Sequence, residues 1–553
     1  MQAQTRRAFL STACGSVLLA ACGRGGAAGE AQTKTGALLF EGEVVFNHGN
    51  GAEPLTLDPH HAQSTWENNI IGDLIVGLTT EDENGVPIPA AAEKWEQSKD
   101  GLTWTFQIRD HQWSDGTPVT AEDFVYAWRR MLDPKTAASY AYYLYLIKNG
   151  EAVNSGKMPV TTLGVSAPSP RTLVAELSQP APYLLQYLMH YATFPVPRHV
   201  VEKHGDTWTR PGTHVGNGAF TLAEWFPNDH VTLLKNPKFY DAANVKIDRH
   251  ICYPTSDYEA GLKRLRAGEL DVQEKLPGQQ IAWLRANMPE TLHLDLILAT
   301  EYLCCNQSVK PFGDVRVREA LSLAVDRETI VNKIDRVGEP PAYSIVPPGI
   351  ANYPGGAELA FKSMPFPDRL KRARELMRAA GYGPDNLLRT SLLIRSASPT
   401  ARRMPVAIQQ MWTQIYVDAQ ILQVDAAIFY NRIQSHDFEI CNPGWVADYN
   451  DASTFLDMLR GDNANNYGYY NNPDCVELLD AATRELDLTE RGKLLAEAEA
   501  IALKDHAWIP IFFSGTDILV RPYVHGWGKV VTDVHRTRWL TIDQAAREAT
   551  KHI

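Results

Sequence analysis

The sequence predicts an α/β protein with two or three domains. Its 553 residues are more than one hydrophobic core usually organises. Segments with the periodicity of helices alternate with segments typical of strands, which is the arrangement found in α/β domains. With 44% hydrophobic and 21% charged residues, the composition is that of an ordinary globular chain.

The first half of the chain combines strands with short helices. A period-2 alternation predicts a strand at 102–109, and a Thr120/Asp123 capping pair predicts the start of a helix that ends before Pro134. The other predicted elements are strands beginning at 44 and at 172–178, a strand–turn–strand at 217–236, helices at 65–77 and 183–191, and a helix, glycine turn and strand over 258–272.

Helices dominate the second half of the chain. We expect them at 315–334, 368–380, 402–415, 426–435, 452–460, 474–486 and 489–504. Strands are predicted between them, at 390–395, 417–424, 438–447 and 509–513. Because helices and strands alternate to the end, the α/β class covers this half as well.

The N-terminus is typical of an export signal over residues 1–21. Within it, Thr5 to Leu10 resembles a twin-arginine translocation motif, and Leu19 to Cys22 resembles a bacterial lipobox. In a lipobox the cysteine is diacylated, so Cys22 is the expected site of lipid attachment. An uncleaved membrane anchor is disfavoured, because the apolar run is shorter than the ~20 residues that a span needs.

Residues 22–43 are rich in Gly and Ala and are predicted to form a flexible tether behind the lipid. No other segment is long and apolar enough to span a bilayer. We therefore expect a periplasmic or otherwise extracytoplasmic protein that meets the membrane only through its anchor, in the inner or the outer membrane. The formal net charge of -12 argues against a nucleic-acid partner, which requires a basic surface.

The cysteines and histidines show no metal-binding spacing, and we expect neither a metal nor a cofactor. Five cysteines follow the tether, an odd number in a compartment that permits disulfides: Cys252, Cys304, Cys305, Cys441 and Cys475. A bridge from Cys304 or Cys305 to Cys441 is one option, and the sequence does not decide between the two. The adjacent His60 and His61 point apart on an extended segment and are expected at the surface of a loop.

Sequence motifs of catalysis are absent. The chain contains no G-x-S-x-G nucleophile elbow, no H-E-x-x-H and no G-x-x-x-x-G-K-[ST] phosphate loop. No residue is therefore assigned a catalytic role, and a binding protein is favoured over an enzyme. A hydrolase remains the alternative, because catalytic triads are recognised by geometry and not by spacing.

One acid lies in unusual surroundings. Residues 444–447 are typical of a short apolar strand that ends at Asp448, with aromatic residues on both sides. No Lys or Arg occurs between Arg432 and Arg460. Since burying an unpaired carboxylate is costly, Asp448 is expected to meet a cation that the local sequence does not supply.

Five segments occur in an order that resembles a known family. Segments 56–68, 92–134, 217–220, 311–334 and 444–451 resemble the periplasmic oligopeptide-binding proteins of ABC importers, solute-binding protein family 5. The resemblance extends from about Val44 to about Tyr523. It implies an α/β, two-lobed periplasmic-binding-protein fold of the class II type with an extra inserted domain. It also implies a monomeric, non-enzymatic receptor that delivers peptides to an ABC permease.

The family fold assigns the segments of this chain to lobes. Lobe I would take 44–75, 198–298 and 516–553, the inserted domain II would take 76–197, and lobe III would take 299–515. In the family the ligand lies between lobes I and III as an extended strand whose backbone pairs with both.

The resemblance also implies a set of ligand-binding residues. Asp448 would meet the free α-amino group of the ligand, a contact of about 4 kcal/mol at 4 Å for an effective dielectric near 20. A micromolar ligand binds with only about 8 kcal/mol in total, so this contact can decide which ligands bind. The other implied contacts are Gly444 and Val446 for backbone pairing, Trp445 and Tyr140 as walls, and Gln63, Ser64 and Thr65 on the opposite side.

The chain departs from the family where short peptides are held by their carboxyl end. Family members use Lys, Arg or His there, whereas this chain has Asp335, Ile433 and Asn442, with Arg402, Arg403 and Arg432 nearby. Ala426 replaces a wall tryptophan, which enlarges one pocket. The sequence therefore leaves open the length of the ligand and how its carboxyl end is held. A receptor for murein peptides or other amine-bearing solutes is the alternative to a general peptide receptor.

Overall fold

The computed structural model describes residues 42–550 except 84, 396–402 and 462. The chain divides by its contacts into residues 1–43 and a compact unit over 44–553. The predicted export signal, Cys22 and Arg402 lie outside the described residues, as does all but the end of the predicted tether. Among the described helices, none combines the length and the hydrophobicity that a membrane crossing requires.

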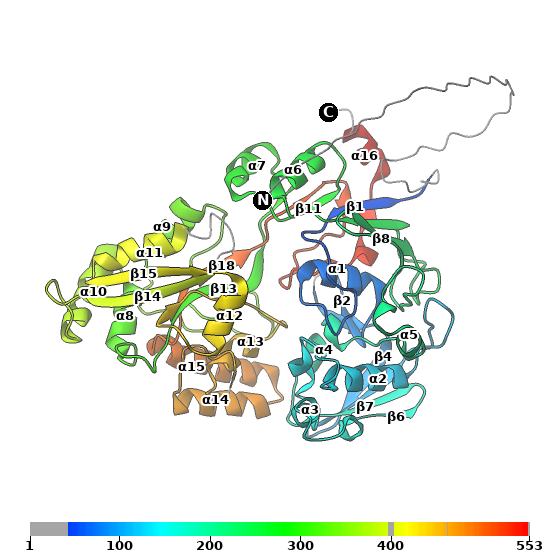
Figure 1. Ribbon diagram of the computed structural model, residues 1–553, viewed down its shortest axis with the longest axis horizontal. Coiled ribbons are helices and arrows are strands. Elements are labelled where there is room, and N and C mark those ends of the chain that lie inside the picture. The colour runs from blue at the N-terminus through cyan, green and yellow to red at the C-terminus, as the bar shows by residue number, and fades with distance from the viewer. Residues whose placement is uncertain (1–41, 84, 396–402, 462, 551–553) are drawn as a thin grey trace, which may run out of the picture. The chain divides into compact units, whose positions relative to one another are not determined.

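The largest sheet has seven strands, drawn from distant parts of the sequence (Figure 1). Its order is β12-β19-β11-β1-β10-β9-β8, and the central β1 runs parallel to both of its neighbours. The strands are β1 (Val45–Gly49), β8 (Phe220–Phe226), β9 (His230–Lys235), β10 (Arg249–Tyr253), β11 (Val272–Glu274), β12 (Leu292–His293) and β19 (Ile518–Val520). The chain segments that carry these strands also contain five helices: α1 (Thr65–Leu74), α5 (Arg198–His204), α6 (Tyr258–Arg266), α7 (Ile281–Asn287) and α16 (Gln544–Thr550). They also contain a two-stranded sheet of β20 (Val524–His525) and β21 (Thr541–Ile542).

A four-stranded antiparallel sheet, in the order β4-β5-β7-β6, occupies part of the predicted inserted domain. Its strands are β4 (Ala92–Gln97), β5 (Thr103–Ile108), β6 (Val165–Ser169) and β7 (Thr172–Glu176). The predicted helix cap is confirmed for α2 (Ala121–Leu132), since the Thr120 amide donates to Asp123 Oδ2 at 2.7 Å. Short elements complete this region: β2 (Thr79–Glu81), β3 (Pro87–Pro89), α3 (Gly150–Asn154) and α4 (Leu184–Tyr187).

A six-stranded sheet is formed by strands from residues 296–515, with the path β15-β14-β16-β13-β17 and β18 also paired to β13. The strands are β13 (Leu296–Cys305), β14 (Leu388–Arg395), β15 (Val417–Val424), β16 (Ile440–Cys441), β17 (Gly444–Val446) and β18 (Ile509–Gly515). The helices are α8 (Val315–Leu323), α9 (Arg327–Thr329), α10 (Phe366–Ala379), α11 (Arg403–Thr413), α12 (Ala426–Gln434), α13 (Ser453–Leu456), α14 (Pro473–Arg484) and α15 (Leu488–Lys504).

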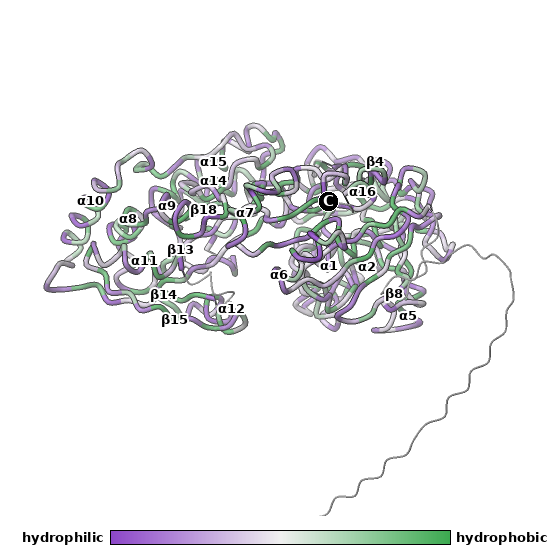
Figure 2. The backbone as a smooth tube through the Cα atoms, turned by 90° about the horizontal axis from the view of Figure 1, so that it is seen from above, coloured by the Kyte–Doolittle hydropathy of each residue, from purple (hydrophilic) through white to green (hydrophobic). Residues whose placement is uncertain are grey.

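Two large hydrophobic cores support these sheets. One joins the seven-stranded and four-stranded sheets and contains Phe46, Phe106 and Trp128, while the other surrounds the six-stranded sheet and contains Tyr302 and Trp412. Hydrophobic and hydrophilic stretches alternate closely along the tube (Figure 2), as expected for elements that bury one face each. The domain boundaries themselves remain a prediction, and β13 crosses the one placed at 298/299.

Several predicted elements are broken in the structure. The helix predicted at 315–334 is wrong as one element, because α8 ends at Leu323 and the Asp326 side chain caps a new start at α9. A π-helical turn, Ile330–Asp335, then follows. The strand predicted at 438–447 is interrupted at Pro443, which has no amide hydrogen to donate. The helix predicted at 183–191 is reduced to α4, and the one at 452–460 to α13 and a 3-10 turn.

Candidate functional site

The candidate site is built around the outer edge of β17. This strand pairs antiparallel with β13, with Trp445 opposite Thr300. On its other side β14 covers only the preceding β16 and its pairing stops at Cys441. In the described part of the chain, no further strand covers the edge of β17, and both Gly444 and Val446 are exposed. The edge can therefore accept an extended segment as an added strand.

Asp448 lies in the loop that follows β17 and is half-buried. Its Oδ2 accepts a single, long hydrogen bond from the Tyr142 hydroxyl at 3.4 Å. The Tyr143 hydroxyl donates to its backbone carbonyl at 2.9 Å, and its amide donates to Thr454 Oγ1 at 3.2 Å. No Lys, Arg or His among the described residues forms an ion pair with it, and burial raises the pKa of its carboxyl to about 7. The loop thus fixes the backbone of Asp448, while its carboxyl has no ion-pair partner in the part of the chain that the structure describes.

Aromatic rings surround this acid. Tyr140, predicted from the sequence, lies 4.8 Å from the ring of His190 and 5.6 Å from that of Tyr143, which stacks on Tyr187 at 4.2 Å. Burial and the Asp448 charge raise the pKa of the Tyr140 phenol, which therefore stays protonated. The result is a wall of hydroxyl-tipped rings that offers apolar faces and hydrogen bonds together.

Trp445 has a mixed position. Its ring packs partly against the hydrophobic core of the six-stranded sheet and is half-buried. Its Nε1 donates to Thr454 Oγ1 at 3.3 Å, the same oxygen that receives the Asp448 amide. Trp445 therefore helps to position the loop of Asp448, and its role as a wall of the ligand site stays a prediction.

The predicted contacts on the opposite side lie at the start of α1. The amides of Gln63 and Ser64 both donate to Glu67 Oε2, at 2.8 and 3.1 Å, and the Gln63 side chain donates to Ser139 Oγ at 2.7 Å. Thr65 is the first helical residue. A ligand strand at this place would have to pair with carbonyl oxygens, because two of the amides are already satisfied by Glu67.

Two adjoining cavities flank the edge of β17. The first, of about 560 Å³, reaches Gly444 and Asn442, and the second, of about 630 Å³, reaches Val446. They share Glu339 and Arg395 in their linings. Volumes of this size accommodate ligand side chains on either side of an added strand.

The first cavity is lined by both acidic and basic side chains. Burial raises the pKa of Glu301 to about 7, of Asp335 to about 6 and of Glu339 to about 8. Glu301 accepts a hydrogen bond from Asn442 Nδ2 at 2.8 Å. The cavity is also lined by Arg395, which donates to the Tyr430 hydroxyl at 2.7 Å, and by Arg403. Neither arginine forms an ion pair with an acid in the described residues, so the positive charge of both is available to a ligand. The acids with a raised pKa become fully ionised only when a cation binds next to them.

The sequence located part of this cavity. Asp335 and Asn442, two positions where family members use a basic residue, line it together with the nearby Arg403, whereas Ile433 is buried in the core. Outside this lining, Arg432 bonds to Asp437 at 2.9 Å and Ala426 is exposed at the start of α12. Sequence reasoning missed a further group because its members come from separate elements without a shared motif: Tyr142, Tyr143, Glu301, Glu339 and Arg395.

The thiols and the paired histidines differ from the expectation. All five cysteines of the described residues are free and buried, although Cys304 lies directly opposite Cys441 in neighbouring strands. The surface position expected for His60 is wrong, because His60 is fully buried and its Nδ1 accepts a hydrogen bond from Arg130 Nη1 at 2.5 Å. His61 is exposed, as expected.

The site combines an open strand edge, an acid without an ion-pair partner among the described residues, and two cavities. This is the arrangement expected of a protein that binds extended ligands. The chain belongs to the bacterial extracellular solute-binding proteins of family 5: residues 86–467 match the family described as "Bacterial extracellular solute-binding proteins, family 5 Middle". The predicted α/β, two-lobed fold of this family is confirmed.

Known relatives agree over nearly the whole chain. The periplasmic oligopeptide-binding protein OppA of Salmonella typhimurium is 36% identical over 95% of this chain and 96% of its own. The structure resembles Haemophilus influenzae OppA in complex with the peptide RPPGFSPFR, with a TM-score of 0.78, 33% identity and coverage of 91% of this chain and 100% of that one. It also resembles the Escherichia coli murein tripeptide binding protein MppA, with a TM-score of 0.79, 31% identity and coverage of 91% and 99%.

Proposed function

We propose that this protein is an extracytoplasmic receptor that captures peptides by their amino end and delivers them to an ABC-type import permease. The observation that carries the proposal is the open edge of β17, which ends at the uncompensated carboxyl of Asp448. The similarity to OppA proteins, which are oligopeptide-binding proteins by name, supports the same ligand class.

In this geometry the contacts that would give a peptide its affinity do not select its amino-acid sequence. Main-chain hydrogen bonds to β17 do not depend on the ligand's side chains, which enter the adjoining cavities and can keep water around them. The ligand's ammonium group then meets Asp448, and the ion pair keeps that carboxyl charged despite its burial. Peptides of many sequences can bind in this way, provided that their amino end is free.

The remaining parts of the proposal concern the cell envelope. The protein is exported through the signal at 1–21, is anchored by lipid on Cys22 and acts as a monomer on the outer side of the cytoplasmic membrane. The lipobox-like residues and the tether composition support this location. Metabolic labelling with a radioactive fatty acid checks it, since labelling is expected in the natural chain and absent in Cys22→Ala.

A second candidate is a receptor for ligands that carry an additional charged group. The observation that favours it is the cavity in which Glu301, Asp335 and Glu339 face the same space as Arg395 and Arg403. A side chain with both an ammonium and a carboxylate would satisfy both sets. The similarity to the murein tripeptide binding protein is consistent with such a ligand.

One experiment tests the main proposal. Native mass spectrometry of the protein purified without refolding identifies any retained ligand, which is then resynthesised with a free or an acetylated α-amine. Calorimetry is expected to show at least tenfold weaker binding of the acetylated form, about 1.4 kcal/mol. Equal affinity for both forms would remove Asp448 from the site. Recovery of fragments after incubation with intact peptide would instead indicate the hydrolase alternative.

A further inference from the structure

A cluster of two histidines and a cysteine lies on one face of the seven-stranded sheet, and none of the three lines either of the two cavities. Strands β1 and β10 are parallel neighbours, with His48 opposite Cys252 and Phe46 opposite His250. Because alternate residues of a strand share a face, His48, His250 and Cys252 all point to the same side of the sheet. They are 3%, 1% and 2% exposed, so solvent does not satisfy their polar atoms.

The three potential ligand atoms converge. His48 Nδ1 lies 3.3 Å from His250 Nε2, and Cys252 Sγ lies 3.2 Å from the same Nε2. All three atoms lie within 4.8 Å of one another. Tetrahedral Zn²⁺ with Zn–N bonds of ~2.0–2.1 Å holds two nitrogens about 3.3 Å apart. The nitrogen spacing is thus already that of a zinc site.

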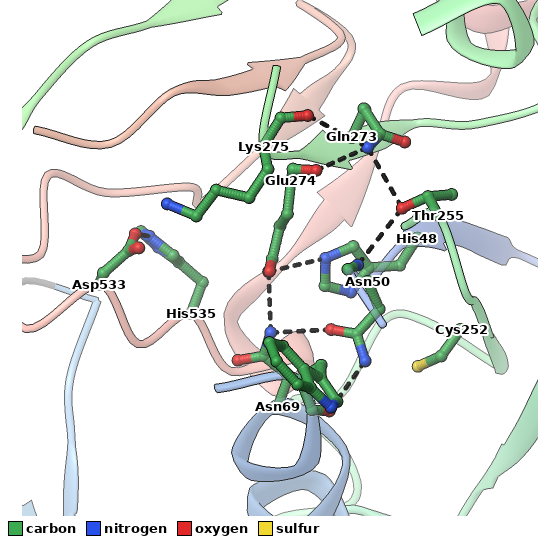
Figure 3. Close-up of polar contacts among 12 residues, drawn as sticks. His48, Asn50, Asn69, Cys252, Thr255, Gln273, Glu274, Lys275, Asp533 and His535 are labelled. Carbon is green, nitrogen blue, oxygen red and sulfur yellow. Dashed lines mark hydrogen bonds and ion pairs between the residues drawn. The ribbon is translucent and has the colours of Figure 1, made fainter. Parts of the chain in front are cut away.

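The outer nitrogen of each ring is fixed by a carboxylate. His48 Nε2 is 3.0 Å from Glu274 Oε1, and Figure 3 shows Glu274 held between His48 and Asn69. His250 Nδ1 is 2.9 Å from Asp73 Oδ2. Carboxylates that accept from the outer N–H of histidines are the usual second shell of protein metal sites, since they set the tautomer that turns the other nitrogen toward the metal.

The hydrogens available inside the cluster are too few. Both carboxylates accept further N–H bonds, Glu274 from Asn69 Nδ2 at 2.8 Å and Asp73 from the Thr537 amide at 3.1 Å, which fits acceptors without a hydrogen of their own. With both rings neutral and each donating outward, two bare nitrogens face each other and only the thiol hydrogen lies between them. The Thr537 hydroxyl, 3.1 Å from His250 Nδ1, reaches only the outer nitrogen of that ring. One lone pair is then left without a partner in a dry interior, which is unfavourable.

We propose that His48 Nδ1, His250 Nε2 and Cys252 Sγ together bind one Zn²⁺ ion. Binding releases the thiol proton to solvent, and the ion satisfies both nitrogens and the thiolate together. The site joins β1 to β10 and, through Glu274 and Asp73, to β11 and α1. It is structural, because it adds the metal's binding free energy to the stability of this sheet. The sequence pattern gave no hint of it, since the ligands come from strands about 200 residues apart.

The test uses the full chain, purified without an affinity tag and without chelator. Metal analysis is expected to find close to one zinc per chain. After exchange with Co²⁺, absorption in the near ultraviolet is expected from sulfur-to-cobalt charge transfer. Cys252→Ser is expected to remove that absorption and to weaken zinc binding at least tenfold, whereas Cys475→Ser, which changes another buried free thiol, leaves both unchanged. Zinc is expected to raise the unfolding temperature of the natural chain and of Cys475→Ser alone.

Two results would overturn the site. One is a natural chain that takes up no stoichiometric zinc or cobalt, even when it is refolded in their presence. The other is a cobalt complex without sulfur-to-cobalt absorption, which decides the matter even if Cys252→Ser does not fold. A complex of that kind would place the metal on surface histidines and leave the cluster as a hydrogen-bonded group.

Discussion

Two acids in the loop between β17 and α13 have opposite surroundings. Asp451 is 2% exposed, and its Oδ2 accepts from Arg491 Nη1 at 2.6 Å while its Oδ1 accepts from the Ser453 amide at 3.0 Å. Asp448, in the same loop, has one long bond to Tyr142 and no ion pair within the described residues. The more deeply buried acid is the one with a complete set of partners.

The difference distinguishes a structural acid from a receptive one. The Asp451–Arg491 pair is closed inside the fold, with the guanidinium also 5.1 Å from the centre of the Tyr183 ring, so the Asp451 charge is already compensated without a ligand. The Asp448 carboxylate, in contrast, is partly desolvated without a counter-charge until a ligand supplies a cation. A half-buried acid next to a fully paired one is therefore a better indication of a binding site than burial or charge alone.

The largest expected effect concerns the closed pair. Asp451→Ala leaves the Arg491 guanidinium buried without a counter-charge, and breaking such a pair typically costs about 3–5 kcal/mol. Denaturant unfolding is expected to show this loss. Asp448→Asn is the matched control in the same loop and is expected to leave the free energy of unfolding unchanged or to raise it, because it removes a buried charge that the described residues do not pair. Equal losses in the two variants would contradict the distinction between the acids.

The next prediction concerns peptide affinity, for which Asp448 and not Asp451 is the sensitive position. Asp448→Asn removes the charge that attracts the ligand's ammonium group and is expected to weaken peptide binding at least tenfold by calorimetry. Asp418→Asn, at an exposed acid in β15, controls for the general loss of one negative charge and is expected to bind normally. An Asp448→Asn variant with unchanged affinity would show that the amine binds elsewhere.

The sequence predicted Asp448 for a local reason, and it could not predict Asp451. The absence of any Lys or Arg near Asp448 in the chain is visible in the sequence, whereas the partner of Asp451 is 40 residues away on α15. The same limit applies to the site as a whole. Tyr142 and Glu301 reach it from other elements, and only the folded chain brings them together.

Elements with local signals were predicted well. The cap of α2 and the strand β15 follow from capping residues and apolar pattern within a few positions. The central strand β13 was not predicted as an element, because it is buried on both faces and shows no period-2 alternation. The continuous helix expected from 315 failed for a tertiary reason, since the buried Arg327 side chain bonds to carbonyls of Ala342 and Pro510.

The pH dependence sharpens the comparison further. In the ligand-free protein the Asp448 pKa is raised to about 7, so its neutral form stabilises the fold below pH ~4, and this contribution is lost as the pH rises through 7. Ligand affinity changes in the opposite direction, because the ion pair needs the ionised carboxyl. Between pH 7.5 and 5.5 the ionised fraction of a carboxyl with this pKa falls about 25-fold, so we expect calorimetry to show a roughly tenfold to 25-fold weaker affinity for a free-amine peptide. Asp448→Asn is expected to flatten this change, and an equally steep profile in that variant would assign it to another acid of the cavity, such as Glu301.

The smallest expected effect comes from the one hydroxyl that contacts Asp448. Tyr142→Phe keeps the ring and removes a hydrogen bond of 3.4 Å, which is too long to contribute much. We expect peptide affinity to change by no more than about threefold in calorimetry. Tyr143→Phe provides the contrast, because its 2.9 Å bond to the Asp448 carbonyl positions the backbone of the loop. It is expected to weaken binding more than Tyr142→Phe does. If Tyr142→Phe were the more damaging change, this hydroxyl would be a principal partner of the carboxyl. Asp448 would then be a paired acid with a structural role, as Asp451 is.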